Sequence, residues 1–231
     1  MEYAEIARAT TSRGEVVLRS RQEQTGLVLE LRVNGVFVMD TQETTTEQAL
    51  ATTALELVED PRNVLVGGLG MGYTAHALLG DVRVERVDVV EIEGALITWM
   101  RDGTVAHGPS LLADQRIRIV EADIATAVQE VHEPTYDLVL LDVDNGPGQL
   151  VHQQNAQVYE TAFLEHCRDI LSPGGILVIW SADRDRRLGD RLRQVFGGCV
   201  ERSFPVVLQQ RETEYWLYAT GPARGSDTVE A

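Results

Sequence analysis

Length, composition and charge narrow what this chain can be. Its 231 residues are 44% hydrophobic, which allows one substantial core and a small appendage. Asp and Glu number 36 against 20 Lys and Arg, giving a net charge of -16, so we expect no partner that is a nucleic acid or an anionic membrane. Two cysteines without a partner motif, no secretory signal and no membrane-length apolar run predict a cytoplasmic protein without a disulfide framework.

Residues 1–43 are predicted to form a small β-hairpin sheet. Apolar runs at 16–18, 27–33 and 36–39 indicate three strands. Asn34-Gly35 accepts the positive φ values of a type I′ turn, so the last two strands should pair as an antiparallel hairpin. Three strands do not make an independent domain. This sheet therefore needs a neighbour to cover it.

Residues 44–220 are predicted to form a larger α/β domain, and 221–231 a disordered tail. Thr44 and Glu47 have capping-box spacing at the start of a helix with an apolar stripe. Strands and helices then alternate, which predicts a doubly wound, mostly parallel, Rossmann-like sheet of seven strands. The strands are expected at 64–66, 87–93, 116–120, 136–142, 176–180, 199–207 and 215–220, and the later helices through 99–100 and at 124–131, 158–171 and 184–196.

The stretch from Asn63 to Glu93 carries the clearest functional signal. A buried strand runs into glycines at 68, 70 and 72, where side chains would fill the space of a ligand lying against main-chain N–H groups. Glu91 follows about 20 residues on, at the end of the next strand, where a carboxylate can accept hydrogen bonds from a ribose diol. This order predicts nucleoside binding by Gly68, Gly70, Gly72 and Glu91. A tight turn beside a surface glutamate is the competing interpretation.

The kind of nucleoside follows from two absences in this loop. A nicotinamide dinucleotide site needs a third glycine where this chain has Tyr73. The loop also lacks an Arg or Lys to help neutralise a pyrophosphate. Both points favour a ligand made of adenosine and a small tail, such as S-adenosylmethionine.

Two more acidic residues end predicted strands. Asp123 and Asp142 should meet Glu91 and the glycine loop, because ligands bind beyond the carboxyl ends of strands in an open α/β sheet. Residues 144–157 then form a long loop that we expect to act as a lid. The five histidines show no metal-ligand spacing, so no metal is inferred.

Together these segments resemble the spermidine synthases, or polyamine aminopropyltransferases, within the class I methyltransferase fold. The resemblance covers roughly residues 31–218. It implies that Glu91 holds the ribose, that Asp123 holds the adenine amino group and that the protein is a homodimer. The matching stretches are Val33-Asn34-Gly35-Val36, the glycine loop, Val90-Glu91-Ile92-Glu93, Ala122-Asp123, Tyr136 to Asp142 and Pro173-Gly174-Gly175.

The chain departs from the family pattern around the substrate. Met71 replaces a loop aspartate that, in the family, grips the cationic aminopropyl end. The family's catalytic aspartate falls on Asn145, or on Asp144 if a gap is allowed. The residues that shape the family's diamine pocket, a Gln and a Tyr-His pair, fall here on Val38, Glu47 and Gln48. We therefore expect a largely rewritten acceptor pocket.

Asp142 and Asp144 are the candidate catalytic residues. A carboxylate stabilises a bound sulfonium in a partly desolvated cleft, and both aspartates suit that role, Asp142 also as a cofactor-binding residue. An amine nucleophile must lose a proton, which a carboxylate within hydrogen-bond reach can accept; Asp144 is the candidate. The alternative for Asp144 is a loop-initiating Asx turn without chemistry.

Three functions stay open on the sequence alone. The favoured one is methyl transfer from S-adenosylmethionine to a small acceptor such as an amine, because Met71 removes the acid that would pair with the ammonium of a decarboxylated donor. We therefore expect tighter binding of S-adenosylmethionine than of its decarboxylated form. The alternatives are aminopropyl transfer from that decarboxylated form and non-catalytic nucleoside binding.

Overall fold

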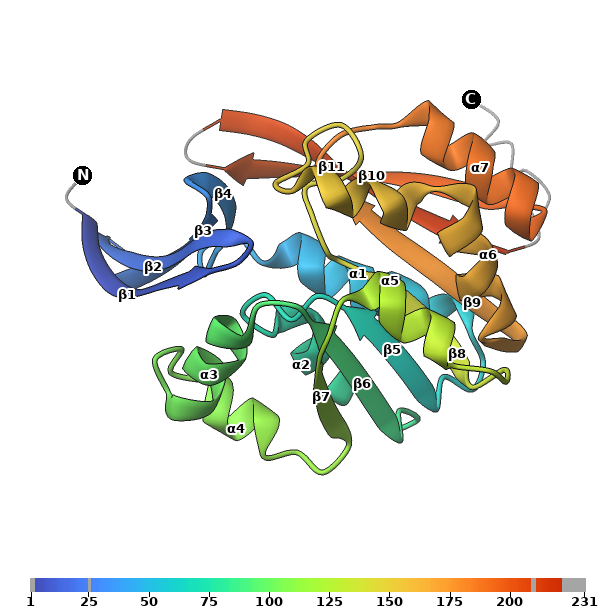
Figure 1. Ribbon diagram of the computed structural model, residues 1–231, viewed down its shortest axis with the longest axis horizontal. Coiled ribbons are helices and arrows are strands. Elements are labelled where there is room, and N and C mark those ends of the chain that lie inside the picture. The colour runs from blue at the N-terminus through green and yellow to red at the C-terminus, as the bar shows by residue number, and fades with distance from the viewer. Residues whose placement is uncertain (1–2, 25, 209–210, 222–231) are drawn as a thin grey trace.

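A computed structural model describes residues 3–24, 26–208 and 211–221, which form two sheets (Figure 1). The small sheet is antiparallel and lies at the N-terminal end of the molecule, beside the larger α/β part. Its strands follow chain order: β1 (Tyr3–Thr11), β2 (Gly14–Glu23), β3 (Gly26–Val33) and β4 (Val36–Asp40).

The small sheet has four strands, so the prediction of three was wrong. The strand that was missed, β1, is mostly exposed along its length, since it lies at the sheet edge and buries too little to need an apolar run. The predicted hairpin is confirmed: Val33 pairs with Val36 across Asn34 (φ 52°) and Gly35 (φ 76°), the positive pair of angles that a type I′ turn requires.

The main sheet has seven strands in the order β10-β11-β9-β8-β5-β6-β7, which confirms the predicted fold class. Neighbours from β9 to β7 pair in parallel, whereas β11 runs antiparallel to both β9 and β10. The strands are β5 (Asn63–Gly67), β6 (Arg86–Glu91), β7 (Ile117–Glu121), β8 (Tyr136–Leu141), β9 (Leu171–Ser181), β10 (Cys199–Leu208) and β11 (Arg211–Thr220).

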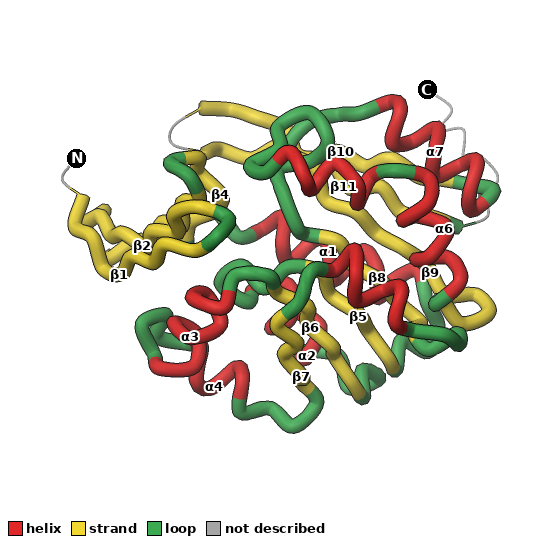
Figure 2. The backbone as a smooth tube through the Cα atoms, viewed as in Figure 1, coloured by secondary structure: helices red, strands yellow, loops and turns green. Residues whose placement is uncertain are grey.

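Helices cover both faces of the main sheet (Figure 2). Alternate residues of each central strand point into opposite layers: Val64 and Val66 pack with α1, α2 and α3, whereas Leu65 packs with α5, α6 and α7. The helices are α1 (Thr45–Leu57), α2 (Tyr73–Leu79), α3 (Gly94–Asp102), α4 (Gly108–Leu112), α5 (Ile124–Ala127), α6 (Thr161–Asp169) and α7 (Arg186–Phe196), with 3-10 turns η1 (Val128–Glu130) and η2 (Gln153–Tyr159).

The segment before α6 differs from its prediction. The loop expected at 144–157 contains η2, and the helix expected to begin at Val158 begins at Thr161. Of the tail predicted for 221–231, residues 222–231 lie outside the described residues. None of the helices in the described ranges has the length and apolarity to cross a membrane.

Candidate functional site

The carboxyl ends of β5, β6 and β8 open onto a cleft of about 1180 Å³, its open mouth included. The small sheet forms the opposite wall, through residues such as Leu31 and Met39. Residues 144–157, the segment expected to act as a lid and called the lid segment below, also line the cleft. Strand ends far apart in the sequence therefore converge on one space, as the parallel sheet requires.

Two of the three predicted glycines line this cleft. Gly68 (φ +95°) and Gly70 (φ +51°) form its floor. A Cβ on Gly68 would lie 2.0 Å from the Asp142 carbonyl oxygen, and one on Gly70 would lie 2.9 Å from Met39 Sδ. Gly72 does not line the cleft, because it packs against the Leu111 side chain below the loop.

Glu91 is buried at the end of β6 and lines the cleft. The Leu69 N–H donates to its Oε2 (2.8 Å) and the Glu93 N–H to its Oε1 (2.7 Å). Burial raises the pKa of this carboxyl group, and the two backbone donors partly offset that effect. Each oxygen keeps a further lone pair, so the carboxylate is held in place and can still accept hydrogen bonds from a ligand.

Asp123 lines the cleft after β7 and is the N-cap of α5. Its Oδ1 accepts from the Ala125 N–H at 2.9 Å, while the Gln157 amide approaches Oδ2 at 3.5 Å. The cap orients the side chain, and Oδ2 remains weakly engaged.

Asp142 follows β8 and lies between the glycine floor and α2. Its Oδ2 accepts from the Thr74 hydroxyl at 3.4 Å. Burial raises the pKa of Asp142 above its ordinary value, and the nearby Glu91 adds to the rise. A cation placed here would relieve that cost.

Asp144 is also buried, and donors surround its carboxylate. Oδ1 accepts from the N–H groups of Asn145 and Val151, each at 2.7 Å, and Oδ2 accepts from Asn155 Nδ2 at 2.7 Å. The Asn145 amide in turn donates to the Phe37 carbonyl at 3.4 Å. These contacts support the loop-organising interpretation of Asp144, since they consume three of its lone pairs to fold the lid.

Arg13, in the β1–β2 turn, ties the small sheet to this lid. Its Nε lies 3.4 Å from Glu93 Oε1, and its Nη2 donates to Asn155 Oδ1 at 3.0 Å. Asn155 is the residue that donates to Asp144. Burial and the neighbouring Arg13 lower the pKa of His152 on the lid, so this histidine adds no positive charge at neutral pH.

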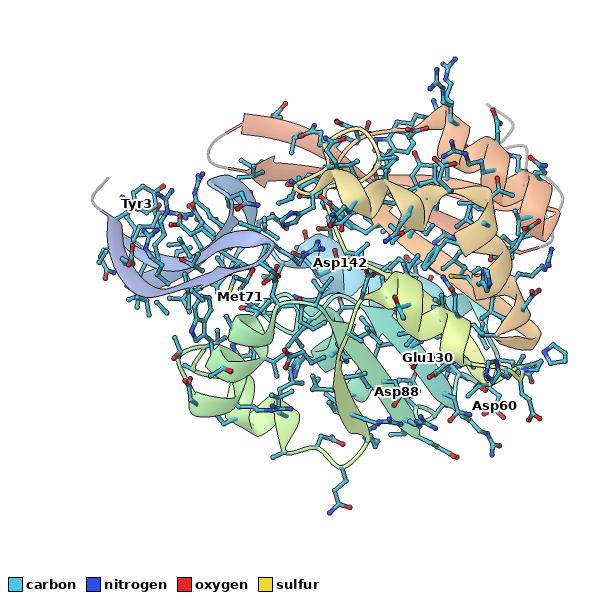
Figure 3. The ribbon with its side chains drawn as sticks, in the orientation of Figure 1. Tyr3, Asp60, Met71, Asp88, Glu130 and Asp142 are labelled. Atoms are coloured by element: carbon cyan, nitrogen blue, oxygen red, sulfur yellow. The ribbon has the colours of Figure 1, made fainter. Side chains whose placement is uncertain are left out.

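Met71 is fully buried in the core beneath the loop and does not line the cleft. Its N–H donates to Met39 Sδ at 3.3 Å, and its carbonyl oxygen lies 2.6 Å from His107 Nε2. Figure 3, which labels Met71 and Asp142, shows both on the side of the main sheet nearest the small sheet. Position 71 therefore presents no carboxylate to a ligand.

Glu47 is the cleft residue whose place the sequence pattern misjudged. The expected capping box is absent, because the Thr44 side chain makes no cap hydrogen bond. Glu47 instead lines the cleft beside α2. Burial raises the pKa of its carboxyl group, and the charge of Asp142 raises it further. The alignment of Glu47 with a pocket residue of the family was the one signal for this position.

The charged and aromatic side chains that line the cleft indicate which class of ligand fits it. Trp180 and Tyr215 line one side with ring centroids 4.8 Å apart, and the buried Trp180 Nε1 has no hydrogen-bond partner among the described residues. One guanidinium, Arg13, faces eight carboxyl side chains in the described lining. The eight are Asp40, Glu43, Glu47, Glu91, Glu93, Asp123, Asp142 and Asp144. Such a lining suits a small cationic molecule.

A family model described as the spermine/spermidine synthase domain matches residues 31–184. The chain belongs to the spermine/spermidine synthase family. Two solved spermidine synthases share its fold at 19% sequence identity, and each covers 94% of this chain. One, in complex with the transition-state analogue AdoDATO, has a TM-score of 0.79 over 73% of its own chain. The other, from Thermotoga maritima, has 0.77 over 72%.

Two kinds of curated relative are found in this family. Putrescine N-methyltransferase 2 of Nicotiana tabacum is 27% identical over 161 residues, which are 65% of this chain and 42% of that protein. The polyamine aminopropyltransferase of Salmonella newport is 29% identical over 184 residues, 74% of this chain and 61% of that protein. The chain therefore spans less than two thirds of either relative.

Proposed function

We propose that this protein transfers a methyl group from S-adenosylmethionine to the nitrogen of a small amine. The observation that carries the proposal is the cleft itself, where a glycine floor and strand-end acids meet a lining of eight carboxyl groups and one guanidinium. The donor carries a sulfonium and the acceptor an amine, so both match that charge. No partner larger than these molecules is needed to account for the lining.

The nucleoside would lie along the strand ends. Glu91 would accept the ribose hydroxyl hydrogens, because its carboxylate is already oriented by two backbone donors. Asp123 would accept from the adenine amino group through Oδ2. At Gly68 and Gly70, which have no side chain, the main chain would lie close to the ligand. Asp142 would lie near the sulfonium.

The side chains at the site have defined tasks in the transfer. The bound donor supplies an electrophilic methyl carbon, which the amine nitrogen attacks as the carbon–sulfur bond breaks and the electron pair stays on sulfur. Asp142 stabilises the donor's positive charge in a desolvated setting. Trp180 and Tyr215 wall the acceptor side and exclude water. The acceptor nitrogen must be unprotonated when it attacks, so a base on this chain beside that nitrogen would speed the transfer.

Methyl transfer is preferred to aminopropyl transfer because of Met71. A decarboxylated donor ends in a bare ammonium, and a thioether in the core cannot pair with it. The resemblance to putrescine N-methyltransferases supports this choice. The resemblance to a polyamine aminopropyltransferase over a larger share of the chain supports the second candidate, aminopropyl transfer.

The donor is tested by side-by-side calorimetric titration. We expect S-adenosylmethionine to bind more tightly than its decarboxylated form, and putrescine with S-adenosylmethionine to give a methylated amine detectable by mass spectrometry. Tighter binding of the decarboxylated donor, together with an aminopropylated product, would replace the proposal by its alternative. Failure of both donors to bind would leave the chain without a transferase function.

We also propose that the protein is a homodimer. The small sheet exposes Leu27 (62%) and Ile6 (45%), and such a sheet gains stability when a second copy covers it. Light scattering at micromolar concentration should give twice the 25.5 kDa chain mass. A mass of one chain under these conditions would refute the dimer.

A further inference from the structure

We propose that Glu47 is the group that accepts the proton from the acceptor amine. This inference rests on the proposed function, in which an amine nitrogen must be unprotonated to attack carbon. The acceptor ammonium first gives one proton to a Glu47 oxygen. The neutral nitrogen then forms its bond to carbon as the carbon–sulfur bond breaks, and the electron pair of that bond stays on sulfur. Five of the other acidic residues in the cleft are already occupied by donors that shape the protein.

The occupied carboxylates are those with backbone donors or ion pairs. Asp144 accepts three hydrogen bonds. Asp40 pairs with Arg21 Nη2 at 2.9 Å and accepts from two backbone N–H groups. The rest are Glu91 with two backbone donors, Glu93 with Arg13, and Asp123 as a helix cap. Protonating any of them would weaken a charge-assisted contact that helps to hold the cleft together.

Glu47 and Asp142 are the carboxyl groups with the fewest partners. Among the described residues Glu47 accepts one side-chain hydrogen bond, from the Thr46 hydroxyl at 3.0 Å, and Asp142 accepts one from Thr74. The remaining lining acid, Glu43, is engaged by both the N–H and the hydroxyl of Thr45. Glu47 therefore keeps oxygen lone pairs that a bound amine can reach.

Glu47 and Asp142 come from elements that meet at Thr74. The Thr74 hydroxyl is 3.4 Å from both the Glu47 carbonyl oxygen and Asp142 Oδ2, so the first turn of α1 meets the end of β8 there. The charge of Asp142 raises the pKa of the Glu47 carboxyl group, so the two carboxylates resist ionising together. We assign the charge that balances the sulfonium to Asp142, beside the glycine floor, and the proton transfer to Glu47, on the aromatic side of the cleft.

The surroundings make Glu47 a better base than an exposed glutamate. Its pKa is raised by burial and by Asp142, which moves proton affinity toward the neutral range where a general base works best. The groups of the described residues that interact with the charge of Glu47 are acids or phenols. They are Glu43 before α1, Tyr73 on α2, Asp142 after β8 and Tyr215 on β11.

The test uses the full chain with putrescine as the acceptor probe and each donor in turn. We expect Glu47→Gln to lower kcat by roughly 10²–10⁴-fold at pH 7 while donor affinity by calorimetry is unchanged. The loss should shrink toward pH 10, because an amine that is already unprotonated needs no base. Glu56→Gln, an exposed glutamate on the same helix, should match the unmodified protein at both pH values.

Two controls separate this role from others. If Asp144 were the base, Asp144→Asn would show the loss that is rescued at high pH, and Glu47→Gln would not; that result would overturn the proposal. A loss in Glu47→Gln that is equal at pH 7 and pH 10 would also overturn it, since it would indicate a merely structural role. An aminopropylated product in place of a methylated one would contradict the proposed function. The comparison of Glu47→Gln at pH 7 and pH 10 would still decide whether Glu47 is the base.

A readout without turnover decides the case in which no product forms. Because the pKa of Glu47 is raised in the folded protein, ionisation of this carboxyl group destabilises the fold at pH 8. Below the ordinary carboxyl range, Glu47 is neutral in both the folded and the unfolded chain. Glu47→Gln should therefore raise the unfolding midpoint by roughly 2–4 °C or more at pH 8 and leave it unchanged near pH 3. Glu56→Gln should show no such difference, and no gain at pH 8 for Glu47→Gln would overturn the assignment.

Discussion

Replacing Glu91 by alanine is expected to weaken donor binding by roughly 1.5–3 kcal/mol, or about 10- to 150-fold. The carboxylate is held between the N–H groups of Leu69 and Glu93 before any ligand arrives, so little ordering is needed when a ribose diol binds. Alanine removes the charged acceptor and also frees the Leu69 N–H at the turn of the glycine loop. Calorimetric titration with S-adenosylmethionine measures the loss.

Glu121 provides the matched control for Glu91. It occupies the paired position at the end of β7, is exposed and does not line the cleft. Glu121→Ala should therefore leave donor affinity within about twofold of the unmodified protein. Unchanged affinity in a folded Glu91→Ala variant would contradict the ribose assignment.

Replacing Gly68 by alanine should lower the free energy of unfolding by roughly 3 kcal/mol or more. At φ +95° an L-residue is strained, and its Cβ would lie 2.0 Å from the Asp142 carbonyl oxygen, a backbone atom that cannot turn aside. The loop or the end of β8 must then shift, and with it the cleft floor. Denaturant unfolding, followed by circular dichroism, measures the change.

Gly70→Ala is the milder companion of that change. Its φ of +51° is a left-handed value that alanine adopts at a cost of about 1–2 kcal/mol, and the nearest atom is the sulfur of the flexible Met39 side chain. We expect Gly70→Ala to destabilise the protein by less than Gly68→Ala. Equal losses would mean that φ strain alone, and not the contact with β8, makes Gly68 necessary.

The main sheet was predictable because its strands are buried on both faces. Runs such as Val64 to Val66 must be apolar in both layers, and each is bounded by glycine, proline or an acid, so position and type could be inferred together. The edge strand β1 lacks this constraint, since most of its residues face solvent. Its pairing with β2 depends on backbone hydrogen bonds that no side-chain pattern reports.

The candidate site was predictable where the rule of strand ends applies. Gly68, Glu91, Asp123 and Asp142 all line the cleft as expected. Gly72 does not line the cleft, because the direction of a loop residue follows from packing, here against Leu111, and not from spacing.

Glu47 and Asp144 show a different limit of sequence reasoning. The spacing of Thr44 and Glu47 is the same whether the glutamate folds back on its helix or enters a cleft, and only the tertiary position of Asp142 separates the two outcomes. Asp144 has its partners at Val151 and Asn155, and the fold of the lid brings them together. The local sequence pattern does not indicate either contact.

The contacts of Arg13 with Glu93 and Asn155 connect the small sheet to the main α/β part across the cleft. The segment that carries the family match begins at residue 31, yet the guanidinium that braces the lid comes from a turn 18 or more positions earlier in the chain. A chimera that grafted only the matched segment onto another protein would carry the acids at the strand ends and would lack the guanidinium that contacts the lid segment. Exchange of function between relatives should therefore take β1 and β2 along with the α/β part.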